Sequence, residues 1–274
     1  MGVRVRELLM GELGSLRYEP TDKRIRAVFG DRTVIDTTRA MLVWEPKRVV
    51  PSYAVPAEDI DAQIGEQPAA DAAADEATAG VPLAGRSVYD PSIPFSAHTC
   101  EGEPLTVSVS GHEAAAFRPA DADLAGYVVL DFAAFDAWYE EDERNVGHPR
   151  DPFHRIDIVH SSRQVRVEAG GEVLAESTNP YLLFEPPLPV RYYLPREDVR
   201  TDLLRPSDRI TFCAYKGQAS YWSFADEEAL VWSYLQPLRD AVEVTGRMAF
   251  FNERVDIVVD GARAERPLTP WSRP

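Results

Sequence analysis

The sequence predicts an all-β protein made of two small domains in tandem, each like a β-sandwich or a barrel, with a short helix at the N-terminus. Three observations support this fold class. Short runs rich in β-branched and aromatic residues recur along the chain, and Pro, Gly, Asp or Asn separates most of them. A long stretch of the first half returns in the second half. The hydrophobic content of 45% is typical of a protein that folds around a core.

The repeat can be followed residue by residue. The stretch that begins at Arg24, "RIRAVFGDRTVIDTTRAMLVWEP", matches the one that begins at Gln164, "QVRVEAGGEVLAESTNPYLLFEP", at an offset of 140 residues. Further on, "SYAVPAEDI" matches "RYYLPREDV". Cys100 then matches Cys213 at an offset of only 113, so the first copy carries an insertion of about 26 residues.

The repeat sets the expected domain limits. Residues 61–80 of the insertion contain no Lys or Arg and are dominated by Ala, Asp and Glu, which predicts a mobile surface loop. The expected parts are an N-terminal helical segment (1–23, with its helix at 4–14), a first β domain (24–147, with the acidic insertion at about 61–85), a joint (148–162), a second β domain (163–261) and an extended tail (262–274).

Composition excludes several classes of partner. A formal net charge of −16 and a pI of about 4.8 disfavour nucleic acid and anionic membranes. No apolar run approaches the roughly 20 residues that span a bilayer. Two cysteines in 274 residues make no disulfide framework, which favours a reducing, cytoplasmic location. No cofactor is predicted, and the oligomeric state stays open.

The segments "TTRAMLVWEP", "YYLPREDV", "CAYKGQASYWS" and "ALVWSY" carry a family resemblance. Together they resemble the bacterial domain of unknown function 427 family, which is also labelled nucleotidyltransferase-like. The joint "FDAWYEEDE…GHPRDPFHRIDI" followed by a second copy looks like the tandem-domain members of that family. The resemblance implies a compact, mostly β domain whose biochemical role is not established.

A nucleotidyltransferase needs metal-holding carboxylates and a cradle for phosphates. The chain has no Gly-x-x-x-x-Gly-Lys loop, and the closely spaced pair near a strand in the second copy is Asp256 and Asp260. No zinc-like spacing is found among the histidines, so no metal site is predicted, although an enzyme that uses those of the joint stays an alternative. The histidines are His98, His112, His148, His154 and His160.

The segment "CAYKG", residues 213–217, combines groups that could carry chemistry. Cys213 could be a nucleophile if a neighbour lowered its pKa, although a small buried hydrophobic residue is the commoner fate of a lone cysteine. Lys216 could contact an anion, form a Schiff base or act as a general base; the ordinary alternative is a solvated lysine in a turn. Gly217 permits a positive φ.

Comparison of the two copies narrows the choice of site residues. Ala57 replaces Arg196 in the first copy, Glu101 stands near the place of Lys216, and the shared Cys100 and Cys213 indicate framework. Alternation along a strand puts Ser220 and Trp222 on one face and Tyr221 on the other, so not every aromatic residue faces one pocket. The catalytic candidates are Lys216, Tyr221 and Cys213, and the ligand-binding candidates are Glu185, Tyr193, Arg196, Tyr215, Lys216, Gly217 and Tyr221.

These observations lead to one hypothesis and two alternatives. We expect a cytosolic tandem β protein that binds a small polar or anionic metabolite in its second domain, at the Cys-Ala-Tyr-Lys-Gly turn. The first alternative is a structural or protein-interaction module in which the aromatic residues are core. The second is a metal-dependent or nucleotidyltransferase-like enzyme.

Overall fold

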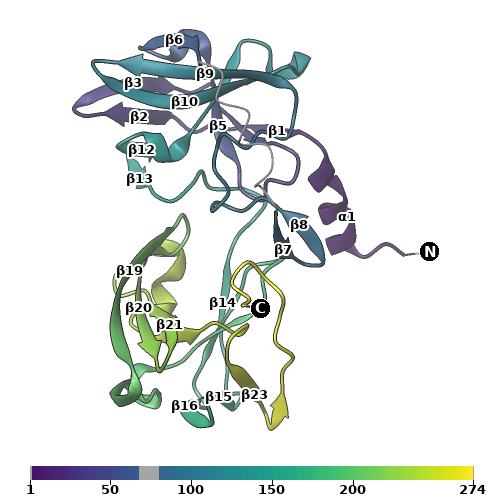
Figure 1. The fold of residues 1–274 in the computed structure, drawn as a ribbon, viewed down its shortest axis with the longest axis vertical. Coiled ribbons are helices and arrows are strands. Elements are labelled where there is room, and N and C mark those ends of the chain that lie inside the picture. The colour runs from purple at the N-terminus through teal and green to yellow at the C-terminus, as the bar shows by residue number, and fades with distance from the viewer. Residues whose placement is uncertain (1, 68–79, 274) are drawn as a thin grey trace. The chain divides into compact units, whose positions relative to one another are not determined.

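The computed structural model describes residues 2–67 and 80–273, and it is built mainly from antiparallel β-sheets, which confirms the predicted fold class (Figure 1). None of the sheets formed by these residues closes into a barrel. The chain divides into a first unit, residues 1–81 and 87–151, and a second unit, residues 82–86 and 152–274. The domain limits expected from the sequence stay a prediction, and the loop predicted for the acidic insertion falls largely at 68–79, outside the described residues.

The first unit is a sandwich of two sheets. Its larger sheet has the strand order β1-β4-β5-β11-β10-β9-β6, and its smaller sheet has the order β13-β12-β2-β3. Strands β7 (Val81–Leu83) and β8 (Arg86–Val88) pair separately. The other elements are α1 (Val5–Gly11), η1 (Glu12–Gly14), β1 (Arg17–Pro20), β2 (Ile25–Phe29), β3 (Arg32–Thr37), β4 (Met41–Trp44), β5 (Ser52–Pro56), η2 (Ala57–Asp59), β6 (Gln63–Glu66), β9 (Gly102–Val109), β10 (His112–Pro119), η4 (Ala122–Leu124), β11 (Tyr127–Leu130), η5 (Phe132–Ala134), β12 (Ala137–Glu140) and β13 (Glu143–Asn145).

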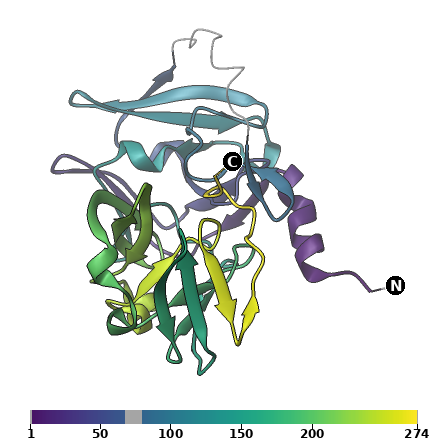
Figure 2. The same ribbon diagram turned by 60° about the horizontal axis from the view of Figure 1, so that its bottom comes forward.

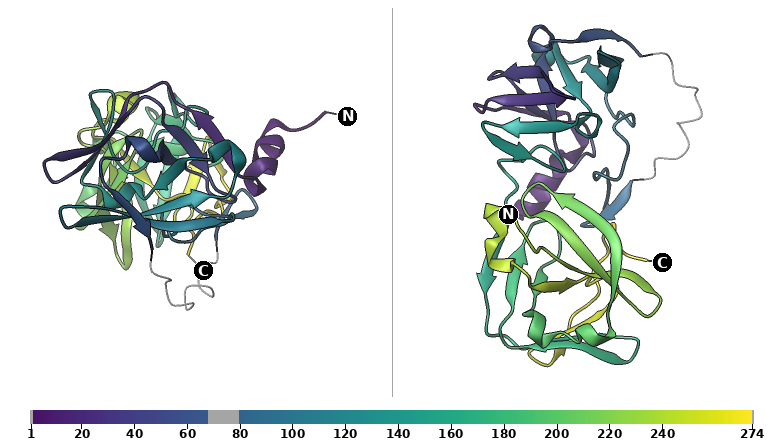
Figure 3. Two further views of the ribbon diagram at one scale, coloured as in Figure 1. Left: turned by 90° about the horizontal axis from the view of Figure 1, so that it is seen from above. Right: turned by 90° about the vertical axis from the view of Figure 1, so that its left-hand side faces the viewer.

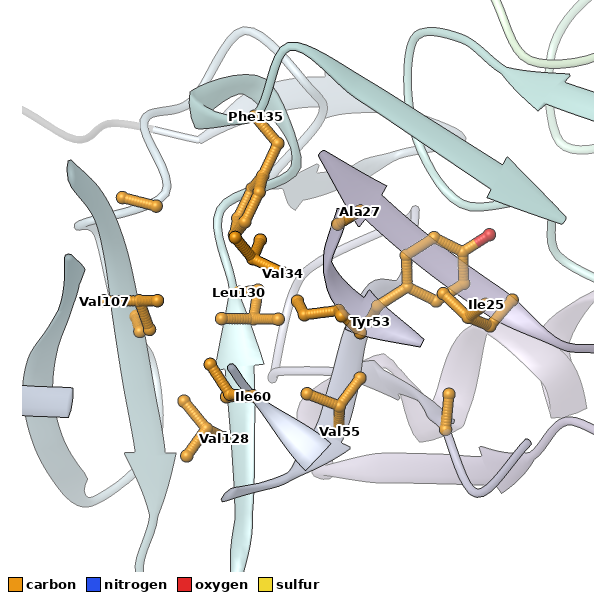
Figure 4. Close-up of a cluster of buried hydrophobic side chains, with 14 of the residues drawn as sticks. Ile25, Ala27, Val34, Tyr53, Val55, Ile60, Val107, Val128, Leu130 and Phe135 are labelled. Carbon is orange, nitrogen blue, oxygen red and sulfur yellow. The ribbon is translucent and has the colours of Figure 1, made fainter. Parts of the chain in front are cut away.

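The core of the first unit lies between its two sheets. Strand β2 buries alternate residues, Ile25, Ala27 and Phe29, as a half-exposed strand does. Figure 4 shows Ile25 and Ala27 of the smaller sheet near side chains of the larger sheet, such as Tyr53 and Leu130. Burial of these side chains, rather than local propensity, therefore holds the two sheets together.

The second unit repeats this plan with the same strand order. Strands β14-β17-β18 and β22-β21-β20-β19 form two sheets that one antiparallel bridge, Leu194 to Met248, joins. The facing sheet has the order β16-β15-β23-β24, seen side by side in green and yellow in Figure 2. The elements are β14 (Asp157–His160), β15 (Val165–Ala169), β16 (Glu172–Ser177), β17 (Tyr181–Phe184), β18 (Arg191–Tyr193), η6 (Arg196–Asp198), η7 (Thr201–Leu203), β19 (Arg205–Cys213), β20 (Gly217–Phe224), β21 (Glu227–Ser233), η8 (Arg239–Val244), β22 (Met248–Phe250), β23 (Asp256–Val259) and β24 (Ala262–Arg263).

The internal repeat extends to small details of the backbone. The hairpin β2–β3 has a register shift after Ala27, and β15–β16 has one after Val167, 140 residues later. Gly30 and Gly170, in the two hairpin turns, have φ values of 58° and 57°. Each turn therefore needs a residue that tolerates the left-handed region, which glycine does at no steric cost.

The C-terminal tail packs on the second unit through a buried ion pair. Arg191 and Glu253 are joined at 2.7 Å, with 7% and 0% of their side chains exposed. Thr269 donates a hydrogen bond of 2.6 Å to Glu253 Oε1, and the guanidinium carbon of Arg191 lies 5.4 Å from the centre of the Trp271 ring. No described helix is long and apolar enough to cross a membrane.

The tail contacts predict that Trp271→Ala destabilises the protein. We expect a loss of about 1–3 kcal/mol in the free energy of unfolding, below the roughly 3–5 kcal/mol of a fully buried tryptophan, because Trp271 is partly exposed. Urea denaturation measures the change. Leu268, 67% exposed in the same tail, is the matched control, and Leu268→Ala should change stability by less than about 0.5 kcal/mol. Equal effects of the two substitutions would contradict a specific role for Trp271.

Candidate functional site

The candidate site begins at the turn between the long strands β19 and β20, the green hairpin in Figure 3. Cys213 and Gly217 face each other across the turn, and Gly217 has a φ of +88°. A Cβ atom at Gly217 would approach the backbone nitrogen and Cγ of Leu238 to 3.3 Å. The predicted positive φ is confirmed, and the close approach gives glycine a second reason to occupy this position.

Lys216 is not the solvated turn lysine that the sequence alone would favour. It is buried, and its Nζ donates a hydrogen bond of 2.5 Å to Oε2 of Glu185, the residue that follows β17. Nε2 of His154 lies 3.6 Å from the other carboxylate oxygen of Glu185. One largely buried carboxylate is thus flanked by two basic side chains from distant parts of the second unit.

These contacts set the protonation states of the buried pair. Burial acts to raise the pKa of Glu185, but the charge of Lys216 and the contacts with His154 and Lys216 outweigh it and lower the pKa to about 2. Burial acts to lower the pKa of Lys216, but Cys213, Glu185 and Tyr193 outweigh it and hold the pKa above its ordinary value. At neutral pH the pair is therefore an ammonium and a carboxylate.

Two of the candidate tyrosines belong to the core of the second unit. Tyr193 and Tyr221 lie in one hydrophobic cluster, which also contains Trp232. The Tyr193 hydroxyl accepts a hydrogen bond of 3.0 Å from Trp232 Nε1, and burial raises the pKa of Tyr193. Tyr221 shares a hydrogen bond of 2.8 Å with Thr211 Oγ1. Each of these hydroxyl groups has a partner within the protein.

Tyr215 lies beside the basic residues of the chain segment that precedes β14. The centre of its ring is 6.0 Å from that of His154 and 5.3 Å from the guanidinium carbon of Arg155. Arg155 in turn pairs with Asp240. Tyr215 and His154 therefore connect this segment to the Lys216–Glu185 pair.

Arg196 lies apart from the other candidates. Its guanidinium is 5.4 Å from the Trp222 ring, and Trp222 packs on the hydrophobic cluster between the sheets, whereas Tyr221 packs on the opposite face of β20. The predicted alternation of Trp222 and Tyr221 is confirmed. Arg196 lies on the side of β20 that Trp222 faces, so the predicted site residues do not all meet in one place.

In the first copy a histidine, which the sequence comparison missed, takes the place of the lysine beside the glutamate. Glu45, the counterpart of Glu185, lies 3.0 Å from Nδ1 of His98 and accepts a hydrogen bond of 2.8 Å from the backbone of Thr99. The imidazole of His98 stacks on the Phe117 ring, and the two ring centres are 3.8 Å apart. The alignment pointed to Glu101 near the place of Lys216, although His98, two residues from the aligned Cys100, was the available signal.

The thiol of Cys100 also belongs to this arrangement. Its sulfur lies 3.8 Å from Oε2 of Glu45. Burial and the charge of Glu45 raise the pKa of Cys100 to about 12, so the thiolate that a nucleophile requires is scarce at neutral pH. Cys100 therefore acts as framework, in agreement with the interpretation of the two shared cysteines.

The other residues considered for catalysis or metal binding have partners away from the Lys216–Glu185 pair. Asp256 pairs with Arg263 at 2.7 Å, and Asp260 pairs with Arg163 at 2.6 Å. His160 contacts Asn179. In residues 2–67 and 80–273 no group of three or more His, Cys, Asp and Glu side chains is arranged to hold a metal ion.

The buried pair predicts a large effect of Lys216→Met. Removal of the ammonium leaves the buried carboxylate of Glu185 with only the contact to His154, so we expect a loss of about 3–5 kcal/mol in the free energy of unfolding at pH 7. Lys23 is the matched control: it pairs with Glu140 at 2.7 Å, but 46% of its side chain is exposed. Lys23→Met should cost only about 0–1 kcal/mol. Urea denaturation measures the free energy of unfolding of both variants. A similar small loss of stability in the two would contradict the burial argument.

The depressed pKa of Glu185 predicts a defined pH dependence. Because the pKa is about 2 in the folded protein and 4.5 in the unfolded reference, the ionised carboxylate stabilises the fold above pH 4.5, and this contribution disappears as pH falls toward 2. The stability difference between the parent and Glu185→Gln should therefore be constant above pH 5 and shrink below pH 4.5. Unfolding curves at a series of pH values measure it. A difference that grows on acidification would contradict the assignment.

A family model places the chain among known proteins. The family model NTP_transf_9, domain of unknown function (DUF427), matches residues 17–74 and 157–261, together more than half of the chain. The two matched segments begin at β1 and at β14, the first strand of each copy. No curated protein matches the chain. The chain therefore belongs to the DUF427 family, a family whose description assigns no function.

Proposed function

We propose that the protein is a cytoplasmic binding protein for a small polar or anionic metabolite, which it holds in the second unit at the turn from Cys213 to Gly217. The observation that carries the proposal is the Lys216–Glu185 pair, joined at 2.5 Å, with His154 at the second carboxylate oxygen. The net charge of −16 supports a small ligand over nucleic acid or an anionic membrane.

A buried ion pair contributes little net free energy to the stability of a fold. The desolvation of two charges offsets much of their attraction, and apolar residues of similar volume often stabilise a protein equally well. The pair of Lys216 and Glu185 therefore has a use other than stability under this proposal. Titratable groups with shifted pKa values gather at functional sites more often than elsewhere, which supports the same conclusion.

The protonation states define what the site offers to a ligand. The ammonium of Lys216 has three N–H groups, and the bond to Glu185 uses one of them. A ligand carboxylate, phosphate or hydroxyl oxygen can accept another. The raised pKa of Lys216 disfavours the neutral amine that a Schiff base requires, so the lysine serves as a charged donor.

Under this proposal the ligand approaches from the side of His154 and Cys213. The His154 side chain is 27% exposed, and Cys213 is partly exposed, whereas Lys216 and Glu185 are nearly covered. A ligand that enters here meets an imidazole, an ammonium and a carboxylate within one small region. These groups match a compact metabolite that carries both an acceptor and a donor.

A structural or protein-interaction module is the second candidate. The observation in its favour is that Tyr193 and Tyr221 are core residues whose hydroxyl groups already have partners. Under this candidate Lys216 and Glu185 satisfy each other and no ligand is needed. We propose no nucleotidyltransferase-like activity, because Arg263 and Arg163 engage the carboxylates that the sequence offered for it.

Native mass spectrometry of the purified chain, followed by thermal unfolding with a panel of polar and anionic metabolites, tests the proposal. We expect a co-purifying small molecule or a panel member that raises Tm, because binding to the folded state alone stabilises it. Lys216→Met should remove the increase, and Lys216→Arg should retain part of it.

His98→Gln is the matched control, because it breaks the equivalent contact with Glu45 in the first copy. This variant should melt lower and still respond to the ligand. If no bound molecule is found and no panel member shifts the parent, the structural candidate is favoured. Equal loss of the response in His98→Gln and Lys216→Met would show that general destabilisation, rather than a local site, explains the result.

A further inference from the structure

Arg196 is an exposed guanidinium that lacks an ionic partner among the described residues. It begins η6, and its guanidinium carbon lies 5.4 Å from the centre of the Trp222 ring, while Nη1 lies 3.9 Å from the sulfur of Met248. A thioether is a weak acceptor, and a guanidinium carries five N–H donors.

The surface beneath Arg196 can be built from the strand registers. Ile210 lies opposite Ser220, Ser220 opposite Ser233, and Ser233 opposite Met248, so these residues form one row across β19, β20, β21 and β22. Residues directly opposite each other share a face of the sheet. Met248 belongs to the cluster between the sheets, so the whole row is on the inner face, together with Trp222.

This row contains a hydroxyl group that the protein leaves unsatisfied. Ser233 is 0% exposed, and its Oγ has no hydrogen-bond partner among the described residues. A buried hydroxyl without a partner costs stability and needs an explanation. Ser220, its neighbour in the row, is partly exposed, so two hydroxyl groups lie side by side on an otherwise apolar face.

The row ends in apolar side chains that face solvent. Ile210 and Phe212 are each 55% exposed, and Phe212 lies opposite Gln218, on the same face as Ile210. The first copy differs at the corresponding places. Val55 and Leu194, which are equivalent in the repeat, pair with Val128 and Met248, and the registers from there place the exposed Glu103 at the position of Ser220.

Two other members of the set differ as well. Leu105 of the core corresponds to Trp222, and Ala57 corresponds to Arg196. The second copy thus has a cation and an indole where the first copy has only aliphatic side chains. Two coordinated changes on one face of a duplicated fold are expected of a binding surface rather than of core packing.

We propose that this inner-face patch, defined by Arg196, Ile210, Phe212, Ser220, Trp222 and Ser233, binds a monoanionic organic carboxylate with an apolar body. The planar guanidinium pairs with the carboxylate through two parallel hydrogen bonds. The hydroxyl groups of the row supply further donors, and Trp222, Ile210 and Phe212 cover the apolar body. The carboxylate of the ligand thus matches the guanidinium, and its apolar body matches the apolar side chains of the patch.

The charge of the patch selects a carboxylate over a phosphate. One guanidinium balances one negative charge, and the surrounding field of a chain of net charge −16 penalises a second. The patch is also separate from the Lys216 site, because Trp222 and Ser220 are on the face of β20 opposite to Tyr221. The two proposals can therefore fail independently.

Isothermal titration calorimetry of the full chain with 2-naphthoate and with decanoate tests the patch. We expect saturable binding of at least one of the two carboxylates, with 2-naphthamide at least tenfold weaker than 2-naphthoate. Arg196→Gln should weaken binding at least tenfold, and Arg196→Lys should weaken it less, because an ammonium cannot form the forked contact. Lys23→Met, which lies in the first unit, is the control and should change the affinity by less than twofold.

Several results would overturn the proposal. Absence of binding by both carboxylates at millimolar concentration would do so, as would equal binding of acid and amide. Tighter binding of 2-naphthyl phosphate would refute the choice of a monoanion. Loss of binding in Lys216→Met with no change in Arg196→Gln would assign the ligand to the turn instead. If Arg196→Gln fails to fold, Trp222→Leu, which restores the residue of the first copy and removes the indole, should also weaken binding.

Discussion

A buried glutamate at the end of one central strand is the constraint on which much of this structure depends. Both copies place it before a proline, as Glu45 and as Glu185. A carboxylate in a covered position is stable only if a positive group or hydrogen-bond donors compensate its desolvation. The rest of each copy must therefore bring a base to that place, and the two copies do so with different residues.

The choice of base decides what each copy can do. His98 stacks on an aromatic ring and contacts Glu45, which leaves an arrangement suited to a rigid framework. Lys216 brings a permanent charge and three donors, and His154 adds a second basic group. The second copy therefore places two basic side chains beside its glutamate where the first copy places one, which explains why the binding proposal belongs there.

Strand β20 presents Tyr221 and Trp222, which are neighbours in the sequence, to two different surfaces. Tyr221 packs into the cluster behind the Lys216 turn, whereas Trp222 faces the space between the sheets beneath Arg196. A strand presents successive side chains to opposite faces, so adjacent residues serve different surfaces. A single strand can consequently contribute to both proposed sites.

The sequence by itself determined the β class, the duplication and the conformation of Gly217. These properties depend on local patterns: alternation of apolar residues, self-similarity along the chain, and a glycine where φ is positive. Only the tertiary structure decided that Lys216 is buried on Glu185, that His98 supplies the base of the first copy, and that Arg196 belongs to another face. The paired residues are 31 and 53 positions apart, so their meeting depends on which strands become neighbours, and no local pattern encodes that.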